Sequence, residues 1–431
     1  MTYLPRIALA FCLIALLPAA LWSQIDRAKY VPEYKDPTLE AMKKRVDSLE
    51  AAQDTITRKI RETQDKFKEE EKNRKKVLRF DFTGVVKPSS PDVFPPVFHF
   101  PPVAQYRTGT CWSFCATSFF ESEVFRLSGK KIKLSEMHTV YYEYVEKARY
   151  FVRQRGDHDI GEGSEDNAVV RIMKKYGMVP FDVYPGYIDD EKHDHTRMSD
   201  EISAYLSYVK DNDIWDEDQV AAHVKLILNA YLGEPPARFA YDGRTMTPPE
   251  FLRDVLRLNP DDYVSVMSTL FIPFYTQGAY DVPDNWWYDS SYYNLPLDEW
   301  YAVIVAAIDK GYTLTIGGDN SEPGWNGFED AAIVPDFDIP AAYINQDSRE
   351  LRFYNHTTED NHGLHLVGHI VIDGRDWFLI KDSGRSARWG KFEGYYFMRD
   401  DYIRLKMLTF MIHKDMLRDL LGKFAQPPDK G

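Results

Sequence analysis

The chain is poor in cysteine, with only Cys12, Cys111 and Cys115 in 431 residues. Two of these are close neighbours and the third lies in an apolar N-terminal run, so they cannot form a disulfide framework. The fold must therefore be stabilised by its core. Hydrophobic residues make up 44% of the chain, which is enough for one large core or for two lobes.

Basic residues are outnumbered by acidic ones, and the formal net charge is −14 at pH 7. An acidic surface repels polyanions, which disfavours nucleic acid and anionic membrane as main partners. Glycine-rich phosphate-binding motifs are missing as well, and we expect no cofactor.

Metal-binding motifs such as His-Glu-x-x-His and Cys-x-x-Cys are absent. The spacing of His362, His365 and His369 leaves zinc as a rival hypothesis, because on a helix these rings would share one face. The surrounding Leu, Val, Ile and Gly instead favour a strand, in which His362 and His365 face opposite ways. We therefore predict no metal.

Near the N-terminus the chain has no apolar run long enough to span a membrane. The apolar stretch 7–22 follows Arg6 and is shorter than the about 20 residues that a spanning helix needs. This pattern is typical of a signal peptide, which we place at residues 1–23. It predicts an exported protein, periplasmic or secreted, and an uncleaved segment that anchors the protein to a membrane is the alternative.

Residues 24–80 are charged and helical in character. Apolar residues recur there at alternating heptad positions, namely Leu39, Met42, Val46, Leu49, Ile56, Ile60 and Phe67. The pattern predicts a coiled-coil-like helix of about four to five heptads. Such a helix either packs on its own domain as a solvated spacer or joins copies of the chain into a homo-oligomer. A globular domain, 81–425, follows, in which a proline-containing linker, 87–96, leads into an extended segment; the tail is 426–431.

One short segment contains a candidate nucleophile and candidate oxyanion donors. Gly109 and Thr110 precede Cys111, which opens a predicted helix over residues 111–127. A thiol at a helix N-terminus lies beside the positive end of the helix dipole, which favours the thiolate. The backbone N–H of this residue can face a developing oxyanion, and Gln105 can donate a second hydrogen bond to it.

This segment resembles the active-site signature of papain-like cysteine peptidases, in which a Gln stands six residues before a Cys-Trp pair. The similarity is to the branch of bleomycin hydrolases and bacterial aminopeptidase C enzymes, and segments 134–137, 145–148 and 176–180 also look like that branch. The resemblance implies that Cys111 is the nucleophile, and that Trp112 contacts the substrate.

The same resemblance implies the other catalytic residues. His362, within the run 361–368, matches the family's base, which takes the thiol proton. Asp382 stands where the family has the Asn that orients the imidazole. The Trp that usually follows is missing, so the hydrogen bond between His362 and Asp382 is shielded only if Trp377 or Trp389 covers it. A carboxylate can hold an imidazole in this way, as in serine triads.

Two glycines are further candidates for contact with a peptide. Gly163 matches the family's substrate-binding loop, where a glycine lets an extended backbone approach, and Gly363 follows the base. The separation between Cys111 and His362 exceeds the roughly 130–150 residues of small papain-type enzymes. The excess falls at about 190–330, where the resemblance implies a helical insertion.

We therefore predict an α+β, papain-like fold with a helical lobe, a β-barrel-like lobe and a cleft between them. The predicted partner is a peptide, hydrolysed through a thioester, and the resemblance favours an aminopeptidase. A cysteine endopeptidase and a peptide-binding protein of low or no activity are the alternatives, the latter because Asp382 replaces Asn.

Overall fold

The computed structural model describes residues 28–51, 55–158, 160–188 and 192–424. The predicted signal peptide, 1–23, and the tail, 426–431, lie outside these residues. Within the described ranges, no helix combines the length and apolar character needed to cross a membrane.

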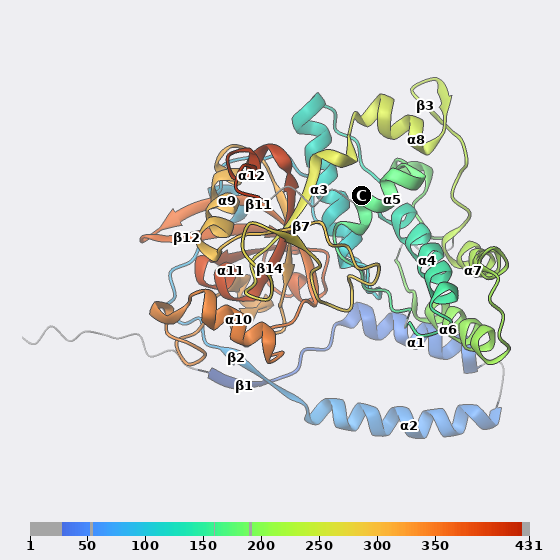
Figure 1. Ribbon diagram of the computed structural model, residues 1–431. Helices are drawn as coiled ribbons and strands as arrows, with labels where there is room; N and C mark the ends of the chain where they lie inside the picture. The colour runs from blue at the N-terminus through green and yellow to red at the C-terminus, as the bar shows by residue number, and fades with distance from the viewer. Residues whose placement is uncertain (1–27, 52–54, 159, 189–191, 425–431) are drawn as a thin grey trace, which may run out of the picture.

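Helices of the middle of the chain form one lobe (Figure 1). They are α3 (Cys111–Ser128), α4 (Glu136–Arg153), α5 (Ala168–Tyr176), α6 (Thr196–Asp211), α7 (Glu217–Leu232), α8 (Pro248–Glu250) and a π-helix at Phe251–Leu256. The central helix α3 is buried along nearly all of its sides, as expected for a helix inside a core. It ends at Gly129, whose φ of 69° is the left-handed conformation that glycine adopts without strain.

The other lobe is built on a sheet of ten strands in the order β6-β7-β5-β14-β8-β11-β12-β13-β10-β9. The strands are β5 (Tyr263–Met267), β6 (Gln277–Gly278), β7 (Tyr292–Asn294), β8 (Leu314–Gly318), β9 (Trp325–Asn326), β10 (Ala331–Ala332), β11 (His362–Ile372), β12 (Arg375–Lys381), β13 (Tyr395–Arg399) and β14 (Met407–His413). The helices of this lobe are α9 (Leu297–Asp309), α10 (Gln346–Tyr354), α11 (Asp400–Lys406) and α12 (Arg418–Leu421). A large apolar cluster that includes Trp300 and Phe410 forms its core.

The site is positioned by the packing of α3 against β11, which brings the helical lobe onto the sheet. The predicted helix over 111–127 is confirmed by α3. Asp373 and Gly374 form the turn of the hairpin between β11 and β12, with φ angles of 51° and 75°. A two-residue turn of this kind matches the twist of the flanking strands.

The N-terminal segment differs from the single long helix that the heptads predicted. It contains β1 (Ala28–Pro32), α1 (Pro37–Ala51), α2 (Thr55–Arg74) and β2 (Lys76–Phe80), and β1 pairs antiparallel with β2. Antiparallel pairing requires the chain to return on itself, so the apolar heptad positions are divided between two helices. Figure 1 shows both helices along one side of the molecule.

This segment contacts both lobes, and we call it the strap (residues 28–51 and 55–80). Met42 of α1 is buried and lies in a depression with Tyr187 and Tyr231 of the helical lobe. At the other end, the backbone N–H of Phe80 donates to Pro323 O in the β-lobe at 2.8 Å. The strap therefore connects the two lobes on one side of the molecule.

The predicted insertion at about 190–330 is only partly helical. Its first part forms α6 and α7, and Asp216 caps α7 by accepting from the backbone N–H groups of Asp218 and Gln219. A small hairpin of β3 (Phe239–Tyr241) and β4 (Arg244–Met246) follows. The later part then supplies β5 and β8 to the ten-stranded sheet, so this sheet extends into the range assigned to the insertion. Gly317 and Gly318 belong to β8.

Candidate active site

A cleft of about 900 Å³ runs along the N-terminal end of α3, and Cys111 lines it. This thiol is free and partly exposed, whereas Trp112 and the residues that follow are buried. Thr110 is the N-cap, and its carbonyl accepts from the N–H groups of Ser113 and Phe114. The reactive sulfur therefore lies at the positive end of the central helix, open to the cleft.

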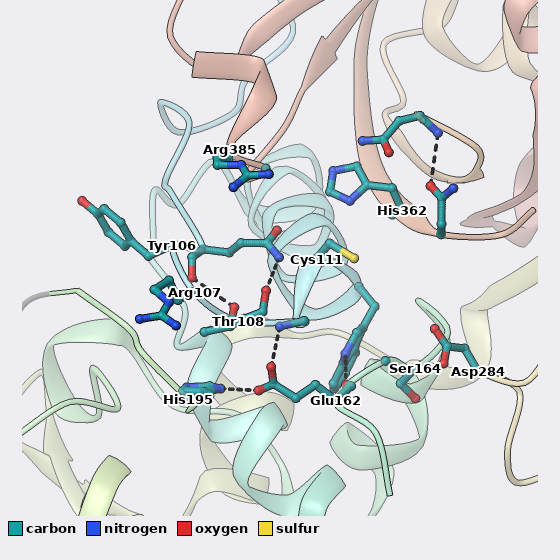
Figure 2. A pocket seen from close by; sticks show the side chains of 18 of the residues that line it. Tyr106, Arg107, Thr108, Cys111, Glu162, Ser164, His195, Asp284, His362 and Arg385 are labelled. Carbon is teal, nitrogen blue, oxygen red and sulfur yellow. Dashed lines mark hydrogen bonds and ion pairs between the residues drawn. The ribbon is translucent and has the colours of Figure 1, made fainter. Parts of the chain in front are cut away.

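The imidazole of His362 lies across from this sulfur, as Figure 2 shows. His362 is the first residue of β11, and its Nε2 is 2.7 Å from Asp382 Oδ1, which leaves Nδ1 for Cys111. Burial lowers the pKa of the imidazole, but the negative charges of Asp382 and Cys111 and their hydrogen bonds to the ring outweigh burial. The pKa of His362 is therefore raised well above its ordinary value, which favours an imidazolium beside the thiolate.

Asp382 follows directly after β12 and is held from several directions. It is only 2% exposed, and its Oδ1 also accepts from the backbone N–H of Gly384 at 2.6 Å. Its own backbone N–H donates to Gly394 O at 2.8 Å. A carboxylate fixed in this way can orient the imidazole of His362 and stabilise its positive charge.

The two tryptophans that could shield this pair both pack against other aromatic side chains. Trp377 lies in an apolar cluster with Phe80 and Phe94. Trp389 packs on Tyr34 and Phe328, with ring centroids 4.9 and 5.2 Å away. The position after Ser383, where the family has its Trp, is occupied by Gly384.

Gly384 occupies the place of the missing Trp and lies against the pair itself. A Cβ at this position would be 3.0 Å from both His362 Nε2 and Asp382 Oδ1. We expect Gly384→Ala to displace the imidazole and to lower kcat/KM roughly ten- to hundredfold, because small misplacements of catalytic groups are costly. Peptidase assays combined with thermal melting measure this effect.

The control for this variant is Gly422→Ala, because a Cβ at Gly422 meets nothing within 4 Å. Its kcat/KM should equal that of the unaltered protein. Equal kcat/KM for Gly384→Ala and the control would show that the ring of His362 tolerates the extra methyl group.

Gln105 connects the loop before α3 to the loop that holds Asp382. Its Nε2 donates to Thr108 O at 2.7 Å, and its Oε1 accepts from Ser383 Oγ at 2.8 Å. The side chain lines the cleft and is 8% exposed. Because one N–H of the amide is used by Thr108, the other remains for a substrate oxygen.

Glu162 is a residue whose contacts the sequence did not indicate. Its Oε2 accepts from the backbone N–H of Gly109 at 2.6 Å, and its Oε1 is 2.6 Å from Nδ1 of His195. Its backbone oxygen accepts from Trp112 Nε1 at 3.0 Å. Glu162 therefore ties the loop before Cys111 to the helical lobe, which fixes the position of the nucleophile (Figure 2).

The glycines predicted to contact substrate line the same cleft. A Cβ at Gly163 would be 2.4 Å from both carboxylate oxygens of Asp284, and one at Gly363 would be 2.8 Å from Asp166 Oδ1. The backbone oxygen of Gly163 also accepts from the ammonium group of Lys147. A carboxylate thus occupies the space next to each glycine, and a larger side chain at either position would displace it.

Besides Glu162 and Asp200, four further carboxylates that line the cleft were absent from the predicted set of site residues. They are Glu165, Asp166, Asp284 and Asp360. The first two directly follow the Gly163 loop and could have been found from that proximity. Asp284 lies in a region with no recognisable motif, so only the fold brings it to Gly163.

The three histidines of the zinc hypothesis have separate partners. His362 contacts Asp382, His365 Nδ1 lies 2.8 Å from Ser118 Oγ, and His369 Nδ1 lies 2.8 Å from Asp309 Oδ1. Among the described residues, no group of three or more His, Cys, Asp or Glu side chains has the geometry to hold a metal ion.

The chain is similar to a known protein family and to several named relatives. The model of the Peptidase C1-like family matches residues 66–429. Aminopeptidase C of Streptococcus thermophilus is 26% identical over 265 residues, which are 50% of this chain and 58% of that protein. Aminopeptidase C of Listeria monocytogenes is 24% identical over 378 residues, 75% of this chain and 82% of that protein.

A solved structure has the same fold. The crystal structure of PepW from Lactobacillus rhamnosis HN001 aligns with a TM-score of 0.61 and 18% identity, over 76% of this chain and 82% of that one. The α+β, papain-like fold predicted from the sequence is thus confirmed. Since the family model covers most of the sequence, including the segments that carry Cys111, His362 and Asp382, the chain belongs to the Peptidase C1-like family.

Proposed function

We propose that the protein is a cysteine aminopeptidase in which Cys111 is the nucleophile. The observation that carries this proposal is the placement of His362 between Asp382 and Cys111, at the N-terminus of α3. Such an arrangement activates a thiol by pairing a thiolate with an imidazolium. The names of the relatives support removal of amino-terminal residues as the form of the activity.

In the proposed reaction, the thiolate of Cys111 attacks the carbonyl carbon of the scissile peptide bond. The backbone N–H of Cys111 and the free N–H of Gln105 stabilise the oxyanion that forms. The imidazolium of His362 gives its proton to the leaving amine, and a thioester remains. Water then attacks the thioester with His362 as base, which breaks the C–S bond, releases the acid and restores the thiolate beside the imidazolium.

Thiol labelling tests the proposed pair directly. We expect iodoacetamide to alkylate Cys111 rapidly at about pH 5 to 6, where an ordinary thiol with a pKa of about 8.5 is unreactive. His362→Ala should remove this acid-range reactivity, and mass spectrometry locates the adduct. Labelling that rises only near pH 8.5 in both proteins would contradict the proposal and would favour a peptide-binding protein.

The form of the peptidase activity is tested with matched substrates. Leucyl and N-acetyl-leucyl amides of 7-amino-4-methylcoumarin differ only in the free amine. An aminopeptidase cleaves the first and leaves the second nearly intact. Preference for the acetylated amide or for cleavage inside longer blocked peptides would indicate an endopeptidase.

A further inference from the structure

The strap passes from one lobe to the other beside the catalytic cleft, between β1 and α1 (Figure 1). On the β-lobe, Tyr34 packs on Trp389 and Phe328, with ring centroids 4.9 and 5.2 Å away. Five residues later, Leu39 lines the cleft together with residues at the start of α6, such as Thr196. The segment 34–39 therefore bridges the two lobes next to the cleft.

Both ends of this crossing segment are fixed. Asp36 Oδ1 accepts from the backbone N–H groups of Thr38 and Leu39 at 2.8 and 3.1 Å, which caps the start of α1. A second residue of the strap, Arg79, places its guanidinium carbon 5.4 Å from the ring centroid of Trp389. The segment lies outside residues 66–429, the part matched by the family model, so the family resemblance does not itself imply this bridge.

The direction of a bound peptide follows from the two ends of the cleft. Gly163, which lies against Asp284, is the position expected to pair with the acyl part of the substrate. Tyr106 and Arg385 lie on the other side of Cys111 from Asp284, as Figure 2 shows. They therefore border the end of the cleft that receives the leaving part of the peptide, which we call the leaving-group end.

Arg385 is a free cation at the leaving-group end. It is exposed and lines the cleft, and among the described residues its guanidinium group has neither a hydrogen bond nor an ion pair. Arg107 differs, since Asp194 pairs with it at 3.1 Å. The guanidinium carbon of Arg385 lies 5.9 Å from the ring centroid of Trp389, the same ring on which Tyr34 packs. The strap and this cation therefore meet at one place.

Arg385 is also close to the reacting atoms. It directly follows Gly384, where a Cβ would be 3.0 Å from Nε2 of His362, the proposed proton donor to the leaving amine. Neighbouring Cα atoms are about 3.8 Å apart, and each extended substrate residue adds about 3.3–3.6 Å. The long side chain of Arg385 can thus reach the first or second residue after the scissile bond. A guanidinium group binds a carboxylate through two parallel hydrogen bonds.

We propose that the strap closes the leaving-group end of the cleft and that Arg385 binds the terminal carboxylate of the substrate there. This inference rests on the proposed peptidase function and names its substrate class, which is short peptides with a free carboxylate. A longer peptide would have to pass the segment 34–39, which both lobes hold in place. The closure therefore selects against it by steric exclusion.

Peptides of two to six residues, each a leucine followed by alanines, test the closure through the rate of leucine release. We expect kcat/KM of the unaltered protein to fall roughly tenfold or more beyond three residues, because the longer products meet the strap. Leu39→Ala and Tyr34→Ala should recover most of this loss on the hexapeptide and leave leucyl-alanine unchanged. Phe67→Ala is the matched control, since this exposed residue of the strap lies outside the cleft.

Two results of the length series would overturn the closure. One is the same dependence on peptide length in the unaltered protein, Leu39→Ala and Tyr34→Ala. The other is an equal gain on peptides of every length in both variants, which would make the strap a general inhibitory segment. If melting shows that Tyr34→Ala does not fold, Leu39→Ala provides the test, since its side chain is partly exposed.

The role of Arg385 is tested with leucyl-alanine and leucyl-alanine amide, which differ in the terminal carboxylate. We expect Arg385→Ala to raise KM for leucyl-alanine roughly tenfold, through loss of a charge-assisted contact, and to leave KM for the amide unchanged. Arg385→Lys should lie between, because it keeps the charge without the fork of donors. Arg244→Ala is the control, since this exposed residue of β4 lies outside the cleft. Equal effects of Arg385→Ala on acid and amide would overturn carboxylate binding.

An acidic side chain is the other possible source of a carboxylate. Leucyl-aspartyl amide distinguishes it, since its only carboxylate is on the side chain. A rise in KM restricted to this substrate in Arg385→Ala would overturn the assignment to the terminal carboxylate.

The alkylation rate of Cys111 separates failure of the closure from failure of the proposed function. Rapid alkylation at pH 5 to 6, together with a length dependence that no strap variant changes, rejects the closure and keeps the peptidase. Alkylation that rises only near the ordinary thiol pKa of about 8.5, with no leucine released, rejects the proposed function and the closure with it.

Discussion

Replacing Cys111 with alanine is expected to lower kcat/KM for a leucyl coumarin amide by roughly four orders of magnitude or more. The variant loses the only atom that can form the thioester, while the oxyanion donors and the cleft remain. Because Cys111 is partly exposed at the start of α3, its truncation leaves the core intact and should not change thermal stability noticeably.

Cys115→Ala is the matched control, since it removes a thiol one turn later on the same helix. Cys115 is 5% exposed, and its Sγ donates to Trp112 O at 3.3 Å and to Asp166 Oδ1 at 3.2 Å. Burial, with the nearby charges of Asp166 and Cys111, raises the pKa of this thiol well above its ordinary value, so it stays protonated. We expect less than a tenfold loss of activity. Comparable losses in the two variants would mean that Cys111 is not the nucleophile.

Replacing Asp382 with alanine is expected to reduce kcat/KM roughly a hundredfold, because His362 then loses the group that orients its ring. Asp382→Asn should be milder, since an amide oxygen can still accept from Nε2. The amide carries no charge, however, and this difference makes the pH profile informative.

The direction in which the pH profile of Asp382→Asn should move follows from the pKa of His362, which Asp382 helps to raise. The active form needs a protonated imidazole beside the thiolate, so activity falls on the alkaline side as His362 loses its proton. Asp382→Asn lowers the pKa of His362 and should move this alkaline limb of kcat/KM to lower pH. Profiles of kcat/KM from pH 5 to 10, measured for the unaltered protein and for Asp382→Asn, test this shift. If the alkaline limb does not move, the decrease in activity reports loss of a proton by a group other than His362.

The sequence was sufficient to predict that Cys111, His362 and Asp382 lie together, and the structure brings them into contact. Local chemistry indicated Cys111, through a glycine turn before a helix, whereas His362 and Asp382 were predicted from the resemblance to papain-like peptidases. The hairpin turn at Asp373 and Gly374 also depends on local sequence, since the dipeptide itself favours the turn. These features need little knowledge of the rest of the fold.

Features that depend on long-range packing were not predictable in this way. The heptads of the strap are compatible with one helix or with two, and the pairing of β1 with β2 decides between them. The contact between Asp284 and Gly163 is of this kind, because it forms only when the β-lobe packs on the helical lobe. The replacement of a covering Trp by Gly384 was visible in the sequence, but its close approach to His362 was not.

The strap has a mechanical consequence for the cleft. Leu39 of α1 lines the cleft, Met42 is buried nearby, and Phe80 is hydrogen-bonded to the β-lobe. Any hinge motion that widens the cleft must either pull α1 from the helical lobe or break the contacts of Phe80. The strap thus ties the two lobes together beside the cleft, and a motion that separated them would have to overcome the free energy of its docking.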